Sequence, residues 1–261
     1  MVTRSSMSMT HNAATNSRPF DVLLFDLGST LIYFADSWDE RMECARHALA
    51  DALPELPRAE LIAHFKTQQA SNYARRDRDL VETPAEQILN RVLEEMTCPL
   101  PARRQRQALD AFYAVMQQSW LPELDALPTL QTLLAEGYRL GLLSNAGDTP
   151  DVNMLLRKAH LTECFERIWV SADIGYRKPH RRSFEPALKH FDLPAARMAM
   201  IGDLLGADIL GAHNAGMSGI WITRRAANAE NERDREQIVP EASIATLAEL
   251  PELLRHWPGK K

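Results

Sequence analysis

The sequence FDVLLFDLGSTL, residues 20–31, combines an apolar run with an acid and a glycine-containing turn. It contains a short apolar run, Val22 to Phe25, and such a run bounded by turn residues predicts a strand that is buried on both faces. The strand ends at Asp26 and continues into a turn that contains Gly28. A carboxylate at the end of such a strand lies at the edge of an α/β sheet where ligands bind. We therefore expect Asp26 to belong to a functional site.

The composition is that of an ordinary globular protein and argues against several functional classes. The 261 residues are 45% hydrophobic and 25% charged, which suits one large domain or a core domain with a smaller insert. A formal net charge of -5 argues against nucleic-acid binding driven by bulk electrostatics. No apolar run approaches the roughly 20 residues that a membrane span needs. We therefore expect neither a nucleic-acid nor a membrane partner, and nothing in the sequence indicates the oligomeric state.

The cysteines and the first residues bear on the location of the protein. Cys44, Cys98 and Cys164 are far apart, form no CxxC pair and are odd in number, which favours a reducing compartment. Residues 1–18 are polar and lack the apolar core of a signal peptide, so we expect a disordered leader there. Together these features predict a cytoplasmic protein.

The spacing of the glycines divides the rest of the chain into two parts. No glycine occurs between Gly28 and Gly137, and this interval is rich in Ala, Leu, Glu, Arg and Gln, which is typical of a helical block. We expect residues 34–124 to form an all-helical domain inserted after the first strand. Its helices are predicted near residues 38–52, 58–75, 84–96 and 102–119.

The remaining sequence alternates between predicted strands and helices. Such βα units form a parallel sheet with helices on both faces. We therefore predict a Rossmann-like, doubly wound α/β core from residues 19–33 and 125–261. After the first strand, its strands are expected near residues 138–143, 167–170, 198–201 and 220–222.

Polar residues follow three of the predicted buried strands, at Asp26, at Ser144-Asn145 and at Asp203. Because the carboxyl ends of parallel strands meet at one edge of a sheet, we expect these side chains to face one cleft. Lys178 follows another strand at that edge. Carboxylates hold Mg²⁺, which keeps water and phosphate oxygens as further ligands, and a lysine neutralises a phosphoryl group. The pattern therefore indicates phosphoryl chemistry.

With these residues in place, the sequence resembles the haloacid dehalogenase superfamily of hydrolases. Each matching motif follows a predicted strand, and the order and spacing agree over residues 20 to about 250. The stretches that resemble the four motifs of the family are DLGSTL at 26–31, for D-x-D-G-T-L, SN at 144–145, RKP at 177–179, and GDLLGAD at 202–208, for G-D-x-x-x-x-D.

The resemblance implies a role for the residues around the phosphoryl group. Asp26 would be the nucleophile that attacks phosphorus and forms an aspartyl-phosphate. Ser144, Asn145 and Thr30 would bind the substrate. Lys178 would stabilise charge on the nucleophile and on the phosphoryl group. The resemblance thus implies a phosphomonoester hydrolase that acts on small phosphorylated metabolites.

The resemblance also implies a metal site and a cap. Asp203 and Asp208 would ligate Mg²⁺ together with Asp26 and the backbone carbonyl of Gly28. The inserted helical domain, residues 34–124, would be the cap that closes over the site, selects the substrate and excludes water.

Gly28 is the position where the chain departs from the family pattern. Phosphatases of the family carry a second aspartate there, which protonates the leaving oxygen and then activates water. Without this aspartate the site lacks its usual general acid and base, and such catalysis typically raises the reaction rate by about 10²–10⁴-fold. Three outcomes follow: a substrate with a good leaving group, a substitute acid from the cap or from Asp36 or Asp39, or slow turnover by a protein that mainly binds phosphate.

Two other functions remain open. The first is a 2-haloacid dehalogenase, which also lacks the second aspartate and needs no metal, although an aromatic residue usually fills the place of Gly28. The pair Asp203 and Asp208 favours a metal-dependent enzyme over this alternative. The second is a catalytically weak phosphate-binding or regulatory protein that has kept the fold.

Overall fold

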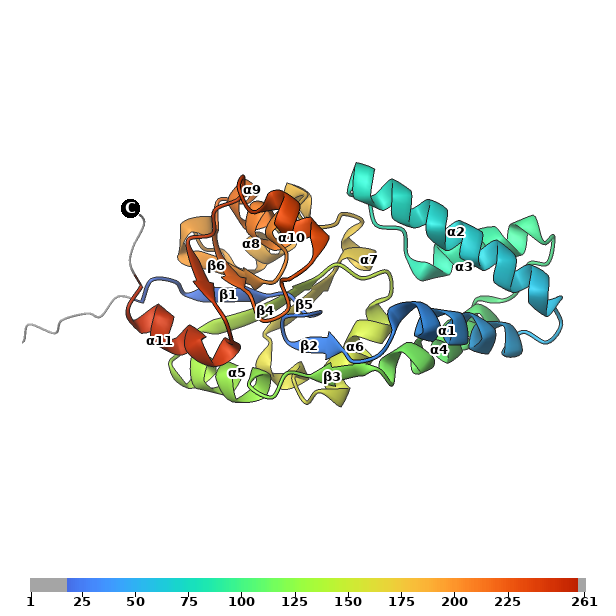
Figure 1. Cartoon of the computed structure of the whole chain (residues 1–261), viewed down its shortest axis with the longest axis horizontal. Coiled ribbons are helices and arrows are strands. Elements are labelled where there is room, and N and C mark those ends of the chain that lie inside the picture. Colours follow the sequence, from blue (N-terminus) through green and yellow to red (C-terminus); the bar gives the residue numbers. More distant parts are fainter. Residues whose placement is uncertain (1–17, 258–261) are drawn as a thin grey trace, which may run out of the picture.

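The core of the protein is a parallel six-stranded sheet, seen here in a computed structural model that describes residues 18–257 (Figure 1). The strand order is β5-β4-β1-β6-β7-β8. The chain passes from β1 to one side of the sheet and returns to the other side, so the strand order reverses at β1. This confirms the predicted doubly wound α/β fold. The strands are β1 (Val22–Phe25), β4 (Arg139–Ser144), β5 (Arg167–Val170), β6 (Met198–Gly202), β7 (Ser218–Ile222) and β8 (Ala242–Ile244).

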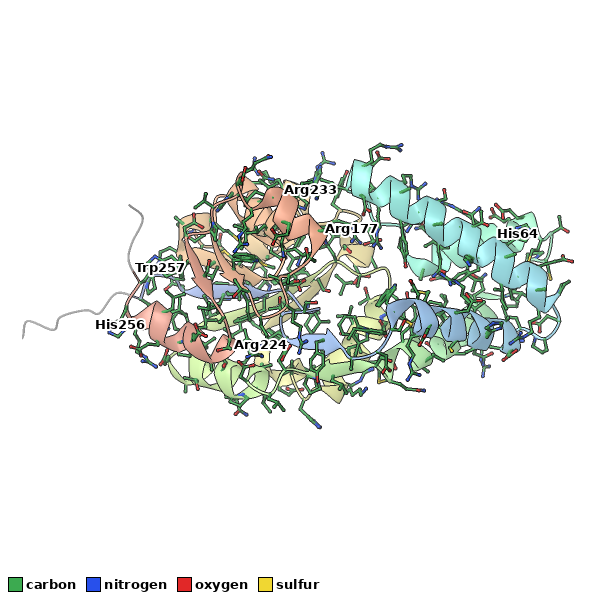
Figure 2. The ribbon with its side chains drawn as sticks, in the orientation of Figure 1. His64, Arg177, Arg224, Arg233, His256 and Trp257 are labelled. Carbon is green, nitrogen blue, oxygen red and sulfur yellow. The ribbon has the colours of Figure 1, made fainter. Side chains whose placement is uncertain are left out.

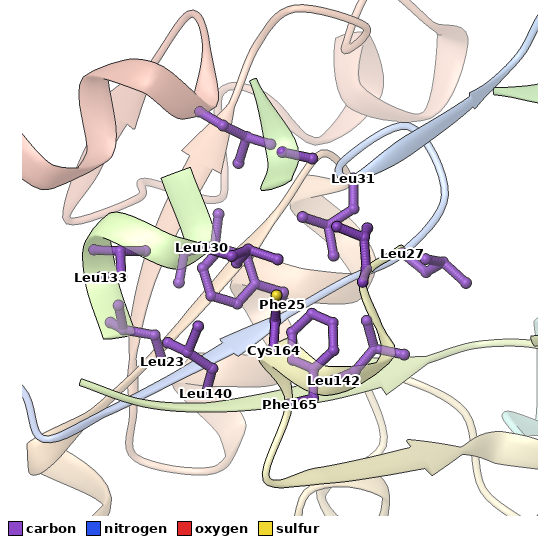
Figure 3. Close-up of a cluster of buried hydrophobic side chains, with 14 of the residues drawn as sticks. Leu23, Phe25, Leu27, Leu31, Leu130, Leu133, Leu140, Leu142, Cys164 and Phe165 are labelled. Atoms are coloured by element: carbon purple, nitrogen blue, oxygen red, sulfur yellow. The ribbon is translucent and has the colours of Figure 1, made fainter. Parts of the chain in front are cut away.

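Strand β1 is apolar along its whole length because helices cover both faces of the sheet. Leu23 and Phe25 pack into a cluster with α5, α6 and α11 (Figure 3). Val22 and Leu24 pack into a second cluster with α8 and α9 on the opposite face. Burying a side chain of this size stabilises the fold by about 1.5–3 kcal/mol. The covering helices are α5 (Ala126–Ala135), α6 (Thr149–Lys158), α8 (Glu185–Phe191), α9 (Leu210–Asn214) and α11 (Leu250–Arg255).

The four helices within residues 38–117 form what we call the helical module, which extends to one side of the sheet (Figure 1). Their apolar faces pack together in a cluster of their own around Leu61, Phe65 and Leu109. None of the helices described has the length and apolarity needed to cross a membrane. The bounds of the helical module are α1 (Trp38–Asp51), α2 (Arg58–Asp79), α3 (Ala85–Glu95) and α4 (Ala102–Gln117).

Several short elements were not predicted. A two-stranded antiparallel ribbon, β2 (Ile32–Phe34) and β3 (Trp120–Pro122), connects the helical module to the core. Strand β8 extends the sheet at its edge. Strands of three residues are too short to show a periodic pattern in the sequence.

Two short helices follow strands of the core, α7 (Ser171–Ile174) after β5 and α10 (Ala229–Asp234) after β7. Of the leader expected over residues 1–18, only Arg18 lies within the described residues.

Candidate active site

Three carboxylates and one lysine meet at the carboxyl edge of the sheet. Lys178 Nζ lies 2.7 Å from Asp26 Oδ1 and 2.7 Å from Asp208 Oδ1. It also donates a hydrogen bond of 2.7 Å to the carbonyl oxygen of Leu143 at the end of β4. Asp203 completes the group, and one oxygen of each aspartate lies within 4.8 Å of the others. All four side chains are buried, so they interact through little water.

The ends of the central strands position these groups. The backbone N–H of Asp26 donates to the carbonyl of Ile201, which holds the end of β1 against β6. At the end of β6, a β-carbon built on Gly202 would stand only 2.2 Å from the Asp208 carboxyl group. Only glycine therefore lets Asp208 fold back beside Asp203. The Asp208 carboxylate also accepts a hydrogen bond of 3.0 Å from the backbone N–H of Leu204.

Asp203 is held by two side chains from beyond its own turn. Trp221 Nε1 and Asn231 Nδ2 each donate a hydrogen bond of 2.9 Å to its backbone carbonyl. Asn231 Oδ1 also accepts from the backbone N–H of Leu205. Asn231 lies on α10 in a run of mixed charge that offers no sequence signal for such a buried contact.

The charge of the group fits a divalent cation with oxygen ligands. Burial raises the pKa of Asp203, and the nearby carboxylates of Asp26 and Asp208 raise it further. Burial also raises the pKa of Asp26, while the Lys178 ammonium opposes that shift. One lysine thus leaves three close carboxylates incompletely neutralised. Within the described part of the chain, the Lys178 ammonium lies beside Asp208 Oδ1 but no donor meets this oxygen in hydrogen-bond geometry, so it keeps an acceptor site for a cation.

The other expected substrate-binding residues occupy different environments. Ser144 lines the cavity over the carboxylates. The Asn145 amide instead holds the backbone of Lys178, accepting from its N–H at 2.8 Å and donating to its carbonyl at 3.0 Å. Thr30 is fully buried outside the cavity lining, and its hydroxyl has no hydrogen-bond partner among the described residues. Asn145 thus acts on the loop that carries Lys178.

Gly28 lies beneath an aromatic ring. A β-carbon built on Gly28 would stand 3.3 Å from Cη2 of Trp120, the first residue of β3. That contact is tighter than most contacts of real β-carbons, so a side chain at Gly28 would have to displace the ring. Trp120 therefore covers the position from which the missing aspartate would extend.

A cavity of about 960 Å³ opens above the carboxylates, between the core and the helical module. Its size suits a small organic ligand. The carboxylates and Lys178 line one part of it, so a bound molecule would meet charge at one end and apolar surface at the other. Aromatic side chains from the helical module and the ribbon supply much of the apolar wall: Trp38, Phe65, Tyr73, Phe112, Tyr113 and Trp120.

A loop of the helical module docks on the core next to this cavity. Buried Glu82 forms a salt bridge with Arg177, the neighbour of Lys178, and accepts a hydrogen bond of 2.7 Å from Ser171. The backbone N–H of Ala85 donates to the carbonyl of Gly147 at 2.8 Å. Figure 2 shows Arg177 at the junction between the core and the helical module. These contacts fix the helical module over the carboxyl edge of the sheet.

The two acids expected as substitutes for the missing aspartate do not line the cavity. Asp36 pairs with Arg41 and accepts a hydrogen bond of 2.6 Å from Ser119, and Asp39 is exposed on α1. The cavity does contain an acid that the sequence analysis missed, Asp151 in the first turn of α6. Its only sequence signal is a place shortly after Ser144-Asn145.

The sheet and its acidic edge define an α/β protein with a centre of carboxylates and lysine. The chain matches the family model of haloacid dehalogenase-like hydrolases over residues 20–216, and it belongs to this family.

Among curated proteins, the chain is 33% identical to the glyceraldehyde 3-phosphate phosphatase of Methanothermobacter thermautotrophicus, over 48% of the chain and 55% of that protein. It thus spans about half the length of this relative. It is 30% identical to the phosphoserine phosphatase of Thermus thermophilus, over 70% of the chain and 74% of that protein.

Among solved structures, a 2-haloacid dehalogenase from Pseudomonas syringae pv. Tomato DC3000 is 25% identical with a TM-score of 0.64, over 91% of this chain and 99% of that one. A phosphatase of the family from Thermococcus onnurineus has a TM-score of 0.60 at 20% identity, over 90% of this chain and 98% of that one. The fold is thus shared by both activities, and the side chains of the site have to distinguish them.

Proposed function

We propose that the protein is a Mg²⁺-dependent phosphomonoester hydrolase that acts on small phosphorylated metabolites through an aspartyl-phosphate on Asp26. The observation that carries this proposal is the group of three buried carboxylates around a single lysine. The curated relatives named as phosphatases support the same reaction class.

Each residue of the group has a part in this reaction. Asp26 attacks phosphorus, and the hydrogen bond from Lys178 keeps its carboxylate oriented and ionised for the attack. The same ammonium group neutralises charge that develops on the phosphoryl oxygens. Ser144 lines the cavity where it contacts those oxygens, and Asn145 positions Lys178 through its backbone.

Asp26, Asp203 and Asp208, with the backbone carbonyl of Gly28, would hold Mg²⁺. When bound, the ion would neutralise the carboxylates and draw the negatively charged phosphate into the site. We propose that the helical module is the cap that excludes water and selects the substrate through its aromatic wall. We also infer a cytoplasmic location, which the three free cysteines support.

The solved 2-haloacid dehalogenase that is 25% identical to the chain over 91% of its length favours the dehalogenase alternative. The acidic group argues against it, because a metal-independent reaction gives no reason to crowd three buried carboxylates around one lysine. A regulatory binder would keep the fold but has no need for a nucleophile such as Asp26, which lines the cavity beside Lys178.

One screen separates the three functions. Phosphate release from a panel of phosphate monoesters and halide release from a 2-haloacid are measured with and without Mg²⁺, for the wild type and for Asp26→Asn. We expect phosphate release that requires Mg²⁺ and that Asp26→Asn abolishes. Halide release without metal would establish the dehalogenase function. The absence of both phosphate and halide release would favour the regulatory binder.

A further inference from the structure

The missing aspartate at Gly28 raises the question of which group serves the leaving oxygen. Apart from Asp26, Asp203 and Asp208, the acids that line the cavity within the described part of the chain are Glu82, Asp148, Asp151 and Glu230.

Three of these four acids are committed elsewhere or exposed. Glu82 is held by Arg177 and Ser171. Asp148 caps α6 by accepting from the backbone N–H of Asp151, and its other oxygen pairs with Arg106 of α4 at 2.6 Å. Glu230 is exposed on α10. This leaves Asp151, which is half-buried, as the one cavity acid of this set that is neither exposed nor held in an ion pair.

Asp151 is hydrogen-bonded to the chain segment that leads to Trp120. Gln117, the last residue of α4, donates a hydrogen bond of 2.7 Å from Nε2 to Asp151 Oδ1. Three residues later the chain reaches Trp120, whose ring covers Gly28. Lys158 at the other end of α6 donates a hydrogen bond of 3.0 Å to the carbonyl of Trp120, so α6 is fixed along the segment that carries the ring. The carboxyl group is therefore held in the cavity that Gly28 also lines, next to the segment whose ring covers Gly28.

The surroundings of Asp151 suit a group that exchanges a proton near neutral pH. Burial raises the pKa of Asp151 to about 7, the Gln117 hydrogen bond opposes this shift, Asp148 adds to it, and Arg106 opposes it. Tyr113 of α4 also faces these acids, and burial raises the pKa of its phenol well above the usual range. Since Gln117 occupies Oδ1, a proton on Asp151 would be carried by Oδ2.

We propose that Asp151 is the general acid and base that replaces the missing aspartate. This inference rests on the proposed function, since it needs Asp26 as the nucleophile. In the first step, Asp151 Oδ2–H gives its proton to the ester oxygen while the bond from that oxygen to phosphorus breaks and the bond from Asp26 to phosphorus forms. The alcohol leaves neutral, and Asp151 is left as a carboxylate.

In the second step, water attacks the phosphorus of the aspartyl-phosphate. Asp151 takes the proton of that water while the bond from phosphorus to Asp26 breaks. Phosphate leaves, Asp26 is again a carboxylate and Asp151 is again a carboxylic acid. Both groups thus return to their starting states.

The test compares two substrates whose leaving groups differ in their need for a proton, with Asp151→Asn as the variant. Butyl phosphate releases an alkoxide unless it is protonated, whereas para-nitrophenyl phosphate releases a stable phenolate. We expect Asp151→Asn to lower kcat/KM for butyl phosphate by about 10²-fold or more and to leave that for para-nitrophenyl phosphate nearly unchanged. With the second substrate, slower attack of water should produce a burst of nitrophenol followed by slow turnover.

Asn at this position keeps the shape of the side chain and an oxygen for Gln117, and Glu230→Gln serves as the control on the same cavity. An equal loss of kcat/KM on both substrates, or no loss on butyl phosphate, would overturn the proposal. A second variant adds Gly28→Asp and Trp120→Leu to the Asp151→Asn protein. We expect it to recover butyl phosphate hydrolysis, and a folded variant that recovers no activity would count against a general acid role for Asp151. If Asp26→Asn stays active, the proposed function itself fails, which is a separate result.

Discussion

Trp120 Cη2 lies 3.3 Å from the point where a β-carbon on Gly28 would stand. The indole edge therefore lies against the point from which a side chain at position 28 would extend. Trp120 also packs edge-to-face against Phe34 and Trp38, so the ring is held by an aromatic group at the base of the helical module. Gly28 and Trp120 are thus sterically coupled, because a side chain at position 28 fits only if the ring at position 120 gives way.

Gly28→Asp tests this pair. In the Asp151→Asn background, where the proposed acid is absent, we expect Gly28→Asp alone to raise turnover of alkyl phosphates only slightly, because the new side chain meets the Trp120 ring. Combined with Trp120→Leu, which leaves room for the carboxylate, it should raise turnover in that background by about 10²-fold. Steady-state kinetics on butyl phosphate provide the measurement, with Trp120→Leu alone as the control. An equal gain in the single and double variants would show that the ring does not obstruct this position.

Lys178→Gln tests the electrostatic balance of the site. Lys178 is almost fully buried between Asp26 and Asp208, so its removal leaves uncompensated carboxylates in the interior. We expect the free energy of unfolding in metal-free buffer to fall by about 3–5 kcal/mol. Urea denaturation provides the measurement. Added Mg²⁺ should recover part of the loss, because a ligand of the folded state alone stabilises it; no recovery would argue against a cation among the carboxylates.

The pH dependence of stability tests the environment of Asp151 without reference to activity. The folded protein keeps this carboxyl protonated up to a pKa of about 7, whereas in the unfolded chain the carboxyl has its ordinary pKa of 3.8. The folded state therefore binds the proton more tightly than the unfolded chain does, and protonation stabilises the fold. This stabilisation is complete below pH 3.8 and is lost as the pH rises through about 7.

Relative to Asp151→Asn, the wild type should thus lose on the order of a few kcal/mol of unfolding free energy between mildly acidic and neutral pH. Urea denaturation of both proteins across this range provides the measurement. Parallel curves for the two proteins would mean that Asp151 titrates as an ordinary exposed carboxyl group.

Two residues of the candidate site, Asp26 and Asp203, directly follow β1 and β6, and the other two, Lys178 and Asp208, lie in the segments after β5 and β6. Asp26, Lys178, Asp203 and Asp208 meet in one group because parallel strands bring their carboxyl ends to one edge, and that rule needs only the order of the elements. Their motifs are also short and local, so each could be recognised without knowing the rest of the fold.

The features that the sequence did not reveal depend on contacts between distant segments. The ring of Trp120 reaches Gly28 only because β2 and β3 pair as an antiparallel ribbon, and both strands are too short to show periodicity. Asp151 resembles any acid in a first helical turn until Gln117 and the buried surroundings are known. The role of Asn145 likewise depends on a contact between distant segments, because its amide hydrogen-bonds the backbone of Lys178.

Rapid-quench mass spectrometry can detect the phosphoryl group that we expect on Asp26 during turnover. The protein is mixed with Mg²⁺ and para-nitrophenyl phosphate, quenched in acid within the first turnover, and digested for peptide mapping. We predict a phosphoryl group on the peptide that contains Asp26, absent without Mg²⁺ and absent in Asp26→Asn. Full phosphate release with no phosphoryl group on Asp26, or with the group on another residue, would contradict the account.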